Sequence, residues 1–385
     1  MDFRGSRVLI LEGYAKQCLP LIKEFRKLGC EVSALCNSKL DVAYASRYTN
    51  HKILGFCNPD NEKKTTEQIE LLLKSGKYDV VIPTVDFSAY ILSKNKERFS
   101  KYCHVLANDF KVLDMAINKN NTMNVCMKNN IPCPETILNV DELSDVINSN
   151  INFPIVVKPK TGYGAIGFKI INDREELITL FEKKENILCD YVFQEYIPQT
   201  DLQYECAMFV DNNNEIKTSV VFSKNRWFPI HGGSSTLNIT VYRPDIIDNC
   251  SKLLKAINWR GPADIDLIQD PRDGKTKVME INPRVSGSVK IVFLSGPNQA
   301  RQMLELLFSE NVTKYETYKI DQRLRCSQTD FLWFLQSPNR FKTKPSYFNR
   351  KHTKDQIFSW GDPLPWITFS IQKIMSFKKE MKKRK

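Results

Sequence analysis

The chain has 385 residues, of which 42% are hydrophobic and 26% are charged, a length and balance typical of a globular protein with two or three domains. No apolar run approaches the roughly 20 residues that a membrane-spanning helix needs. The first residues lack the apolar core and cleavage site of a signal peptide. The 11 cysteines form no C-x-x-C pair, and the four histidines are isolated. We therefore expect a cytoplasmic protein with reduced thiols and without a structural zinc site.

The net charge of +12 is concentrated near the end of the chain. Residues 323–385 hold 15 Lys or Arg and 4 Asp or Glu, so the preceding residues are close to neutral. A neutral main body argues against a nucleic-acid-binding surface, and we expect no nucleic-acid partner.

The first part of the chain alternates apolar strands with helical patterns. Residues 7–11, 32–35 and 78–83 are apolar runs, and residues 19–28 and 87–99 have helical spacing. This alternation predicts an open parallel sheet that is covered on both faces. The segment EGYAKQ after the first run fits a dinucleotide fingerprint poorly. We interpret this part as a support and as one wall of a substrate cleft.

The stretch FPIVVKPKTGYGAIGFKI, which starts at Phe153, predicts a strand, a glycine loop and a second strand. Glycines at this spacing let backbone N–H groups approach phosphate oxygens, and Lys158 at the strand end places an ammonium group beside them. A plain hairpin with a surface lysine fits this stretch equally well. Lys119 lies about forty residues earlier, between two helical stretches, and by itself resembles any exposed lysine.

Two segments with polar side chains follow. Residues 192–197 (VFQEYI) predict a strand and a linker whose backbone can meet an adenine edge. A hairpin then predicts that Gln203 or Glu205 holds ribose hydroxyls. The segment SKNRWFPIHGGSS supplies Lys224, Arg226 and His231 before a loop of small residues, although a solvated loop has the same composition.

The segment ADIDLIQDPRDGKTKVMEINPRVSGS predicts a second hairpin with oxygen ligands. Asp266 and Glu280 can face each other across its strands, and Asn282 follows two residues after Glu280 on the same face. Two carboxylates and an amide are the hard oxygen ligands that Mg²⁺ takes together with phosphates and water. Arg284 suits a forked contact with a phosphate or a carboxylate.

Together these motifs resemble the ATP-grasp superfamily of carboxylate–amine ligases over about residues 8–310. The resemblance implies an α/β (α+β ATP-grasp) fold. An N-terminal open parallel preATP-grasp domain would cover residues 1–112. A two-lobed ATP-grasp domain would cover residues 113–310, with a lid subdomain at about 153–222, and residues 311–385 would form an aromatic and basic extension.

The resemblance also assigns roles. Residues expected to bind ATP are Lys119, Lys158, Lys160, Gly162, Gly164, Gly167, Glu195, Tyr196, Ile197, Gln203, Glu205 and His231. Residues expected to hold Mg²⁺, or Mn²⁺ in its place, are Asp266, Glu280 and Asn282, with Asp264 as a substitute for Asp266. The expected catalytic residues are Lys158, Arg226 and Arg284.

The implied reaction activates a substrate carboxylate as an acylphosphate and joins it to an amine, with release of ADP and phosphate. The alternative is an ATP-binding scaffold that keeps the fold without turnover. The aromatic segments DFLWF and DPLPW resemble those of ATP-grasp proteins associated with cell-surface polysaccharide synthesis. The last residues predict a helix with an apolar face and clustered lysines, which packs on the body or contacts an anionic membrane surface. A homodimer is the default oligomeric state.

Overall fold

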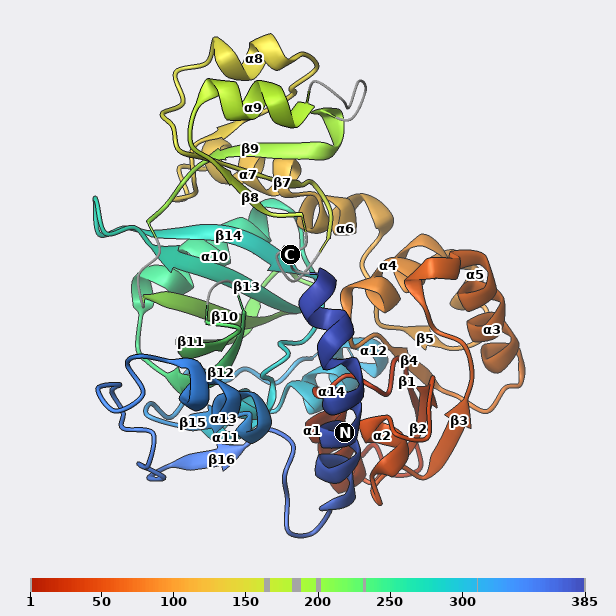
Figure 1. Ribbon diagram of the computed structural model, residues 1–385. Helices are drawn as coiled ribbons and strands as arrows, with labels where there is room; N and C mark the ends of the chain where they lie inside the picture. Colours follow the sequence, from red (N-terminus) through yellow and green to blue (C-terminus); the bar gives the residue numbers. More distant parts are fainter. Residues whose placement is uncertain are drawn as a thin grey trace.

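The computed structural model describes residues 2–162, 167–181, 188–198, 202–230, 233–309 and 311–383, with the side chains of the last helix described up to residue 375. Its described strands form three sheets. Figure 1 shows the smallest sheet above the largest one, with the first part of the chain beside them.

The first part of the chain forms a five-stranded sheet with the order β3-β2-β1-β4-β5, in which all neighbours are parallel. Its apolar strands are buried, which confirms the predicted parallel sheet. The predicted helix over residues 87–99 is interrupted at Asn95. The elements are β1 (Arg7–Ile10), α1 (Cys18–Lys27), β2 (Glu31–Cys36), α2 (Val42–Ala45), β3 (His51–Leu54), a 3-10 turn (Pro59–Asn61), α3 (Glu62–Lys74), β4 (Val80–Ile82), α4 (Asp86–Lys94), α5 (Lys96–Phe99) and β5 (His104–Val105).

A four-stranded antiparallel sheet follows, with the order β6-β9-β7-β8. Helices α8 and α9 pack on it through apolar side chains that include Val146, Leu177 and Phe193. The elements are α6 (Phe110–Ile117), α7 (Lys119–Lys128), β6 (Thr136–Ile137), α8 (Leu143–Ile147), β7 (Ile155–Pro159), β8 (Lys169–Ile171), α9 (Arg174–Phe181), a 3-10 turn (Leu188–Asp190) and β9 (Tyr191–Glu195). The sheet therefore spans residues 136–195, whereas the lid was predicted at about 153–222.

The largest sheet has seven strands in the order β14-β13-β10-β11-β12-β15-β16, antiparallel except for the β15–β16 pair. Because β10 pairs with β13, this sheet includes residues 203–222, which the prediction placed in the lid. The elements are β10 (Gln203–Val210), β11 (Ile216–Phe228), β12 (Ser234–Thr240), α10 (Pro244–Ala256), β13 (Gly261–Gln269), β14 (Thr276–Asn282), α11 (Lys290–Ser295), α12 (Gln299–Phe308), β15 (Arg323–Arg325) and β16 (Thr353–Asp355).

The two faces of the seven-stranded sheet have different neighbours. On one face, Met208 and Ile265 join Leu253 of α10 and Met123 of α7 in one buried cluster. On the other face, side chains of β10 and β11 pack with α11, α12 and the five-stranded sheet. The five-stranded sheet is thus fixed against the large sheet through a continuous apolar core.

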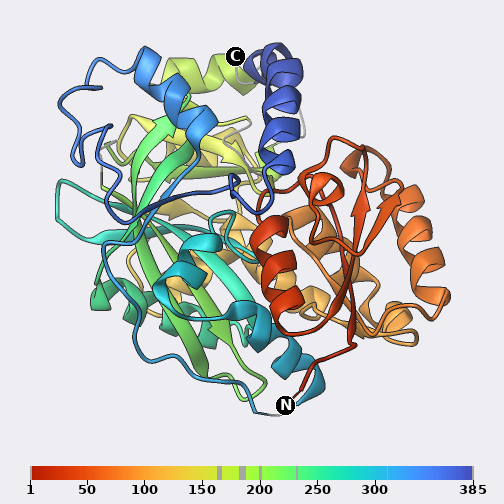
Figure 2. The ribbon, with the colours of Figure 1, turned by 90° about the horizontal axis from the view of Figure 1, so that it is seen from below.

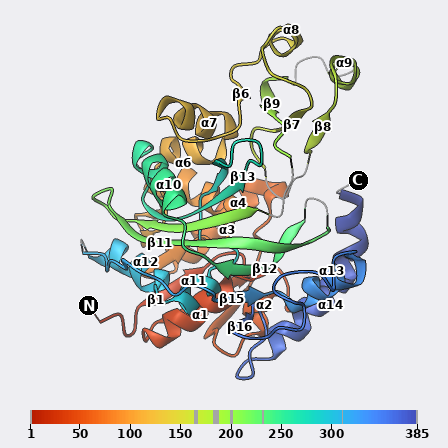
Figure 3. The same ribbon diagram turned by 90° about the vertical axis from the view of Figure 1, so that its left-hand side faces the viewer.

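The last part of the chain adds two helices, α13 (Ser327–Gln336) and α14 (Leu364–Lys383). The Trp366 indole donates a hydrogen bond to Ser327 Oγ at 2.9 Å, and the Gln372 amide donates one to Asp41 Oδ1 at 2.8 Å. Figures 2 and 3 show α14 running beside both α13 and the first part of the chain. No described helix is both long and apolar enough to cross a membrane.

Candidate functional site

Two lysines and a carboxylate meet where the small sheet faces the large one. Lys158 ends β7, Lys119 begins α7, and Glu280 lies on β14. Lys119 Nζ is 3.3 Å from Glu280 Oε2 and donates to the Gly162 carbonyl at 3.1 Å. The Lys119 N–H also donates to the Lys160 carbonyl at 2.9 Å. These contacts tie α7, the start of the glycine loop and β14 together.

Lys158 is almost completely buried beside this group. Burial lowers its pKa to about 8; the Glu280 charge opposes this shift and the Lys119 charge adds to it. A buried lysine near a second lysine lacks full charge compensation. The site therefore favours an additional anion, as a phosphate would be.

The predicted oxygen ligands face each other in the hairpin of β13 and β14. Asp266 pairs with Glu280 across the strands, and Asp264 pairs with Asn282. The Asn282 amide donates to Asp266 Oδ2 at 3.2 Å. Directly opposed residues have Cβ atoms about 5 Å apart, so both carboxylates can reach one cation.

Lys224 is a central residue of this cluster, although the sequence analysis named it without giving it a role in the site. It ion-pairs with Glu205 at 3.0 Å and also with Asp266. Burial opposes the charged forms, yet the two neighbouring carboxylates raise the pKa of Lys224. The Lys224 ammonium likewise holds the pKa of Asp266 below its usual value. The register of β10 and β11 could have revealed this contact, since Gln203 pairs with Lys224 two residues before Glu205.

Arg284 follows β14 and links the hairpin to the five-stranded sheet. Its guanidinium is 3.1 Å from both Asp264 Oδ2 and Asp86 Oδ1, and it donates to Asn282 Oδ1 at 3.0 Å. Burial, followed by the Glu205 charge, raises the pKa of Asp264 well above its usual value, and Arg284 opposes this shift. The predicted cationic residue thus lies beside the predicted oxygen ligands.

The predicted adenine and ribose residues lie at the junction of the two sheets. Glu195 ends β9 and ion-pairs with Lys277 at 2.6 Å and Arg272 at 2.5 Å, so its carboxylate is engaged within the protein. Its neighbours Tyr196 and Ile197 continue the linker, with the Tyr196 N–H 3.3 Å from the Pro154 carbonyl. Gln203 begins β10 next to this linker, whereas Glu205 lies deeper and accepts from Ser286 Oγ at 3.0 Å.

Arg226, which was predicted to be catalytic, lies away from the cluster around Asp266. It is almost completely buried, ion-pairs with Asp330 at 3.0 Å and donates to the Pro345 carbonyl at 2.7 Å. The pairing of β11 with β12 shifts register between Lys224 and Arg226, a bulge that re-aims the second side chain. Arg226 therefore contacts the C-terminal segment and not the cluster around Asp266.

The remaining predicted residues belong to loops. Gly162 and Gly167 have backbone φ angles of +131° and +76°, which favour glycine, and the Lys160 N–H donates to the Asp190 carbonyl at 2.8 Å. Gly164 and His231 lie outside the described residues, so their predicted contacts with a nucleotide stay predictions.

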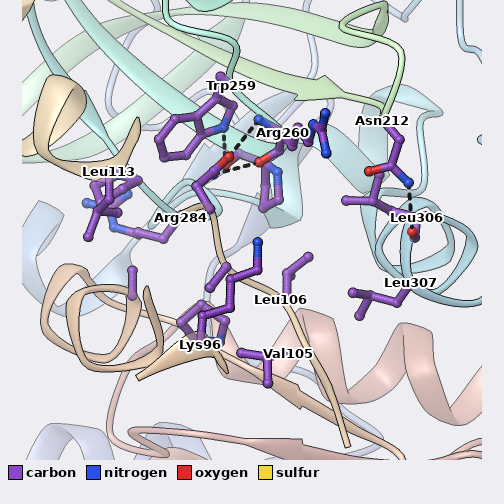
Figure 4. A pocket seen from close by; sticks show the side chains of 16 residues that line it. Lys96, Val105, Leu106, Leu113, Asn212, Trp259, Arg260, Arg284, Leu306 and Leu307 are labelled. Carbon is purple, nitrogen blue, oxygen red and sulfur yellow. Dashed lines mark hydrogen bonds between the residues drawn. The ribbon is translucent and has the colours of Figure 1, made fainter. Parts of the chain in front are cut away.

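A separate cavity of about 160 Å³ lies between the five-stranded and seven-stranded sheets. Figure 4 shows its lining, in which Lys96, Arg260 and Arg284 carry charge and Trp259 and Leu306 are apolar. It adjoins Arg284, but Lys119, Lys158 and Glu280 do not line it. The cavity is therefore distinct from the lysine and carboxylate cluster.

The donor set fits a hard divalent cation. Within the described ranges, no three His, Cys, Asp or Glu side chains converge as a metal site. Asp266, Glu280 and Asn282 nevertheless supply two carboxylates and one amide, and Mg²⁺ completes its shell with phosphate oxygens and water. Asp264 Oδ1, which is buried and has no hydrogen-bond partner among the residues that the structure describes, is a further oxygen at this place.

The fold and the cluster define an α/β protein in which lysines and carboxylates converge at the junction of two sheets. Residues 116–288 match the family model of the ATP-grasp domain. The chain also resembles biotin carboxylase from Campylobacter jejuni (TM-score 0.69, 13% identity, 82% of this chain and 74% of that one). For N5-carboxyaminoimidazole synthetase from Staphylococcus aureus, complexed with ADP, the TM-score is 0.65 at 16% identity, over 83% of this chain and 81% of that one. Residues 116–288 therefore form an ATP-grasp domain, as the resemblance implied.

A sequence relative is the D-aspartate ligase of Enterococcus faecium (strain Aus0004), with 27% identity over 253 residues. The match covers 60% of this chain and 59% of that protein. The L-amino acid ligase from Bacillus licheniformis has a similar fold (TM-score 0.60, 18% identity, 79% of this chain and 75% of that one).

Proposed function

We propose that the chain is an ATP-dependent ligase that activates a carboxylate as an acylphosphate and joins it to an amine. The observation that carries this proposal is the meeting of Lys119 and Lys158 from one side with Asp266 and Glu280 from the other. Such a junction has cations for the phosphates of ATP and oxygens for Mg²⁺. Because the chain has an ATP-grasp fold and both halves of the site, an enzyme with turnover is favoured over an ATP-binding scaffold without turnover.

The residues divide the work as follows. Lys119 and Lys158 would bind the phosphates, and the segment from Lys160 to Gly167 would cover them. Glu195, Tyr196 and Ile197 would line the adenine site, with Gln203 near the ribose. Glu205 is a weaker ribose candidate because it is engaged by Lys224 and Ser286.

Asp266, Glu280 and Asn282 would hold Mg²⁺, with Mn²⁺ as a substitute. When bound, the cation neutralises charge on the transferring phosphoryl group. Lys119 and Lys224, which now neutralise Glu280 and Asp266, can then turn toward phosphate or substrate oxygens. Arg284 is placed to bind the substrate carboxylate or its acylphosphate, since it joins the hairpin to the five-stranded sheet.

The domain division that suits this function has residues 1–112 as a substrate-side wall, 113–310 as the ATP-grasp domain and 311–385 as an extension. The similarity to a D-aspartate ligase and to an L-amino acid ligase favours an amino acid as the carboxylate substrate. The finer role, tailoring of a cell-surface polysaccharide precursor in the cytoplasm, rests only on the aromatic C-terminal segments.

The C-terminal extension supports a peripheral contact with an anionic membrane. Ten of the exposed large apolar side chains in the described part of the chain lie within residues 331–375, among them Trp360 at 90% exposed. Leu364, Ile367, Ile371 and Ile374 form an exposed stripe on α14, because residues three and four apart share a helix face. The charge of residues 323–385, 15 basic against 4 acidic residues, suits anionic lipid.

The test is a phosphate-release assay with ATP, Mg²⁺ and a panel of D- and L-amino acids, each with an amine or hydroxylamine as acceptor. We expect release of ADP and phosphate that requires both an acid and an acceptor, with Mn²⁺ compared as the second metal. Tight ATP binding without release across the panel would support the scaffold instead.

A further inference from the structure

The five-stranded sheet reverses its strand order at the carboxyl ends of β1 and β4. The chain passes from β1 to β2 on one side and later returns to β4 on the other, so the strand order reverses between these two strands. Ligands of open parallel sheets bind at such a reversal. The loops there are firmly joined, since Thr84 Oγ1 donates to the Leu11 carbonyl at 2.8 Å and the Gln17 amide donates to the Thr84 carbonyl at 2.6 Å.

Two carboxylates lie at this reversal of the strand order. Glu12 follows β1 with a φ of +56° and is 1% exposed. Among the described residues, no hydrogen bond of normal geometry reaches its carboxylate oxygens, and the Ser88 hydroxyl is close enough to lower its pKa. Asp86 begins α4, and its side chain is 26% exposed. A buried carboxylate without partners costs free energy, and a left-handed φ on a non-glycine residue adds strain. Such costs in one place favour a functional explanation.

The surroundings are rich in carboxylates. Glu12 and Asp86 lie on the side of the five-stranded sheet, and Glu205, Asp264 and Asp266 lie on the large sheet, where burial raises the pKa of Asp264. The cations that face them are Arg284 and Lys224. Asp264 and Asp266 belong to the proposed Mg²⁺ site. On the side of the five-stranded sheet, Glu12 and Asp86 then have one ion pair with a cation in the described part of the chain, that of Asp86 with Arg284, which favours a ligand with a positive charge.

We propose that Asp86, with Glu12 behind it, receives the amine substrate of the ligase reaction and that Asp86 takes a proton from it. This inference rests on the proposed function, and it assigns the amine to the carboxyl ends of β1 and β4. Arg284, 3.1 Å from Asp86, would then place the acylphosphate next to the amine. Burial also raises the pKa of Glu12 to about 7, and the Asp86 charge adds to this shift while Ser88 opposes it. A bound cation would favour the charged form of the Glu12 carboxylate.

The chemistry balances without a further reactant. A bound ammonium group gives one proton to an Asp86 oxygen and becomes a free amine. Its nitrogen forms the bond to the acyl carbon while the bond from that carbon to the phosphate oxygen breaks. The phosphate leaves with the electron pair and takes up the second proton from nitrogen.

The experiment compares two acceptors in the Asp86→Asn variant of the full chain. Hydroxylamine is uncharged at neutral pH and traps an acylphosphate as a hydroxamate without a protein base. We expect amide formation with the amine selected by the screen to fall about 100-fold or more. Hydroxamate formation from the same acid should stay close to that of the unmodified protein. In Glu12→Gln, a positioning variant, we expect a higher KM for the amine with unchanged hydroxamate formation.

Asp60→Asn, at an exposed aspartate of the same part of the chain, is the matched control and should leave both products unchanged. Equal loss of amide and hydroxamate in Asp86→Asn would overturn the proposal, because Asp86 would then act by holding Arg284. Unchanged amide formation would overturn it as well. If the unmodified protein forms no hydroxamate with any acid, the ligase function itself fails.

Discussion

At the scale of single residues, Lys158 shows how burial sets a functional charge. Its neighbours are one carboxylate and one lysine, and burial brings its pKa to about 8. A phosphate would supply the missing negative charge. Below pH 8 the ammonium form is present and attracts ATP; above pH 8 it is progressively lost.

We therefore predict that the affinity for ATP falls as the pH rises through about 8, and that Lys158→Ala removes this dependence. The variant should bind ATP about 10–100-fold more weakly at pH 7, since a hydrogen bond to a charged group contributes roughly 1.5–3 kcal/mol. Titration calorimetry at several pH values measures both effects. Lys128→Ala, at an exposed lysine that ends α7, is the control. An unchanged affinity in Lys158→Ala would remove Lys158 from the phosphate site.

At the scale of elements, α13 is fixed to the large sheet by a buried charge network. Asp330 is completely buried and pairs with Arg226 at 3.0 Å and with Arg325 at 2.5 Å. The Arg226 guanidinium also stacks over Trp333 at 4.8 Å from the ring centroid. Removing one partner of a buried pair leaves an uncompensated charge.

Asp330→Asn should therefore lower the free energy of unfolding by about 3–5 kcal/mol. Urea denaturation measures this change. Asp321→Asn, which removes a carboxylate that is 43% exposed and paired with Arg323, should cost less than about 1 kcal/mol. An equally small loss of unfolding free energy in Asp330→Asn would mean that the buried network does not hold α13.

The apolar stripe on α14 gives a second prediction at this scale. Ile371→Glu with Ile374→Glu should abolish sedimentation with vesicles of anionic lipid, because these exposed side chains would otherwise enter the bilayer surface. Leu71→Glu, at a side chain that is 67% exposed on α3, should leave vesicle binding unchanged. Binding to neutral vesicles should be weaker throughout. If the unmodified chain does not bind anionic vesicles, the stripe has another role.

At the scale of the whole molecule, two sheets from different parts of the chain have to meet for the site to exist. A nucleotide bound between them stabilises both. At 100 times its Kd, MgATP should raise the free energy of unfolding by about 2.7 kcal/mol.

In Glu280→Gln we expect turnover to be lost and the Mg²⁺-dependent part of this stabilisation to disappear, while the fold is retained. Thermal unfolding with ATP, with and without Mg²⁺, separates these effects, and Glu316→Gln at a 73% exposed site is the control. Near-normal turnover in Glu280→Gln would place the cation elsewhere.

Periodicity and residue chemistry were enough to predict the open parallel sheet, the β13–β14 hairpin and the facing of Asp266 and Glu280. These features depend on local rules: apolar runs bury, and hairpin strands pair with their neighbours. The membership of β10 and β11 in the large sheet was missed, because pairing with β13 joins residues about sixty positions apart.

The sequence by itself determined which residue types the site would contain, since strand ends and glycine loops fix ammonium and carboxylate groups locally. Only the tertiary structure decided which of them meet. It brought Lys119 to Glu280 and Lys224 to Asp266, turned Arg226 toward Asp330 through a bulge, and placed Asp86 on Arg284. These contacts arise from the packing of one sheet on another, and packing between distant segments leaves no periodic signal along the chain.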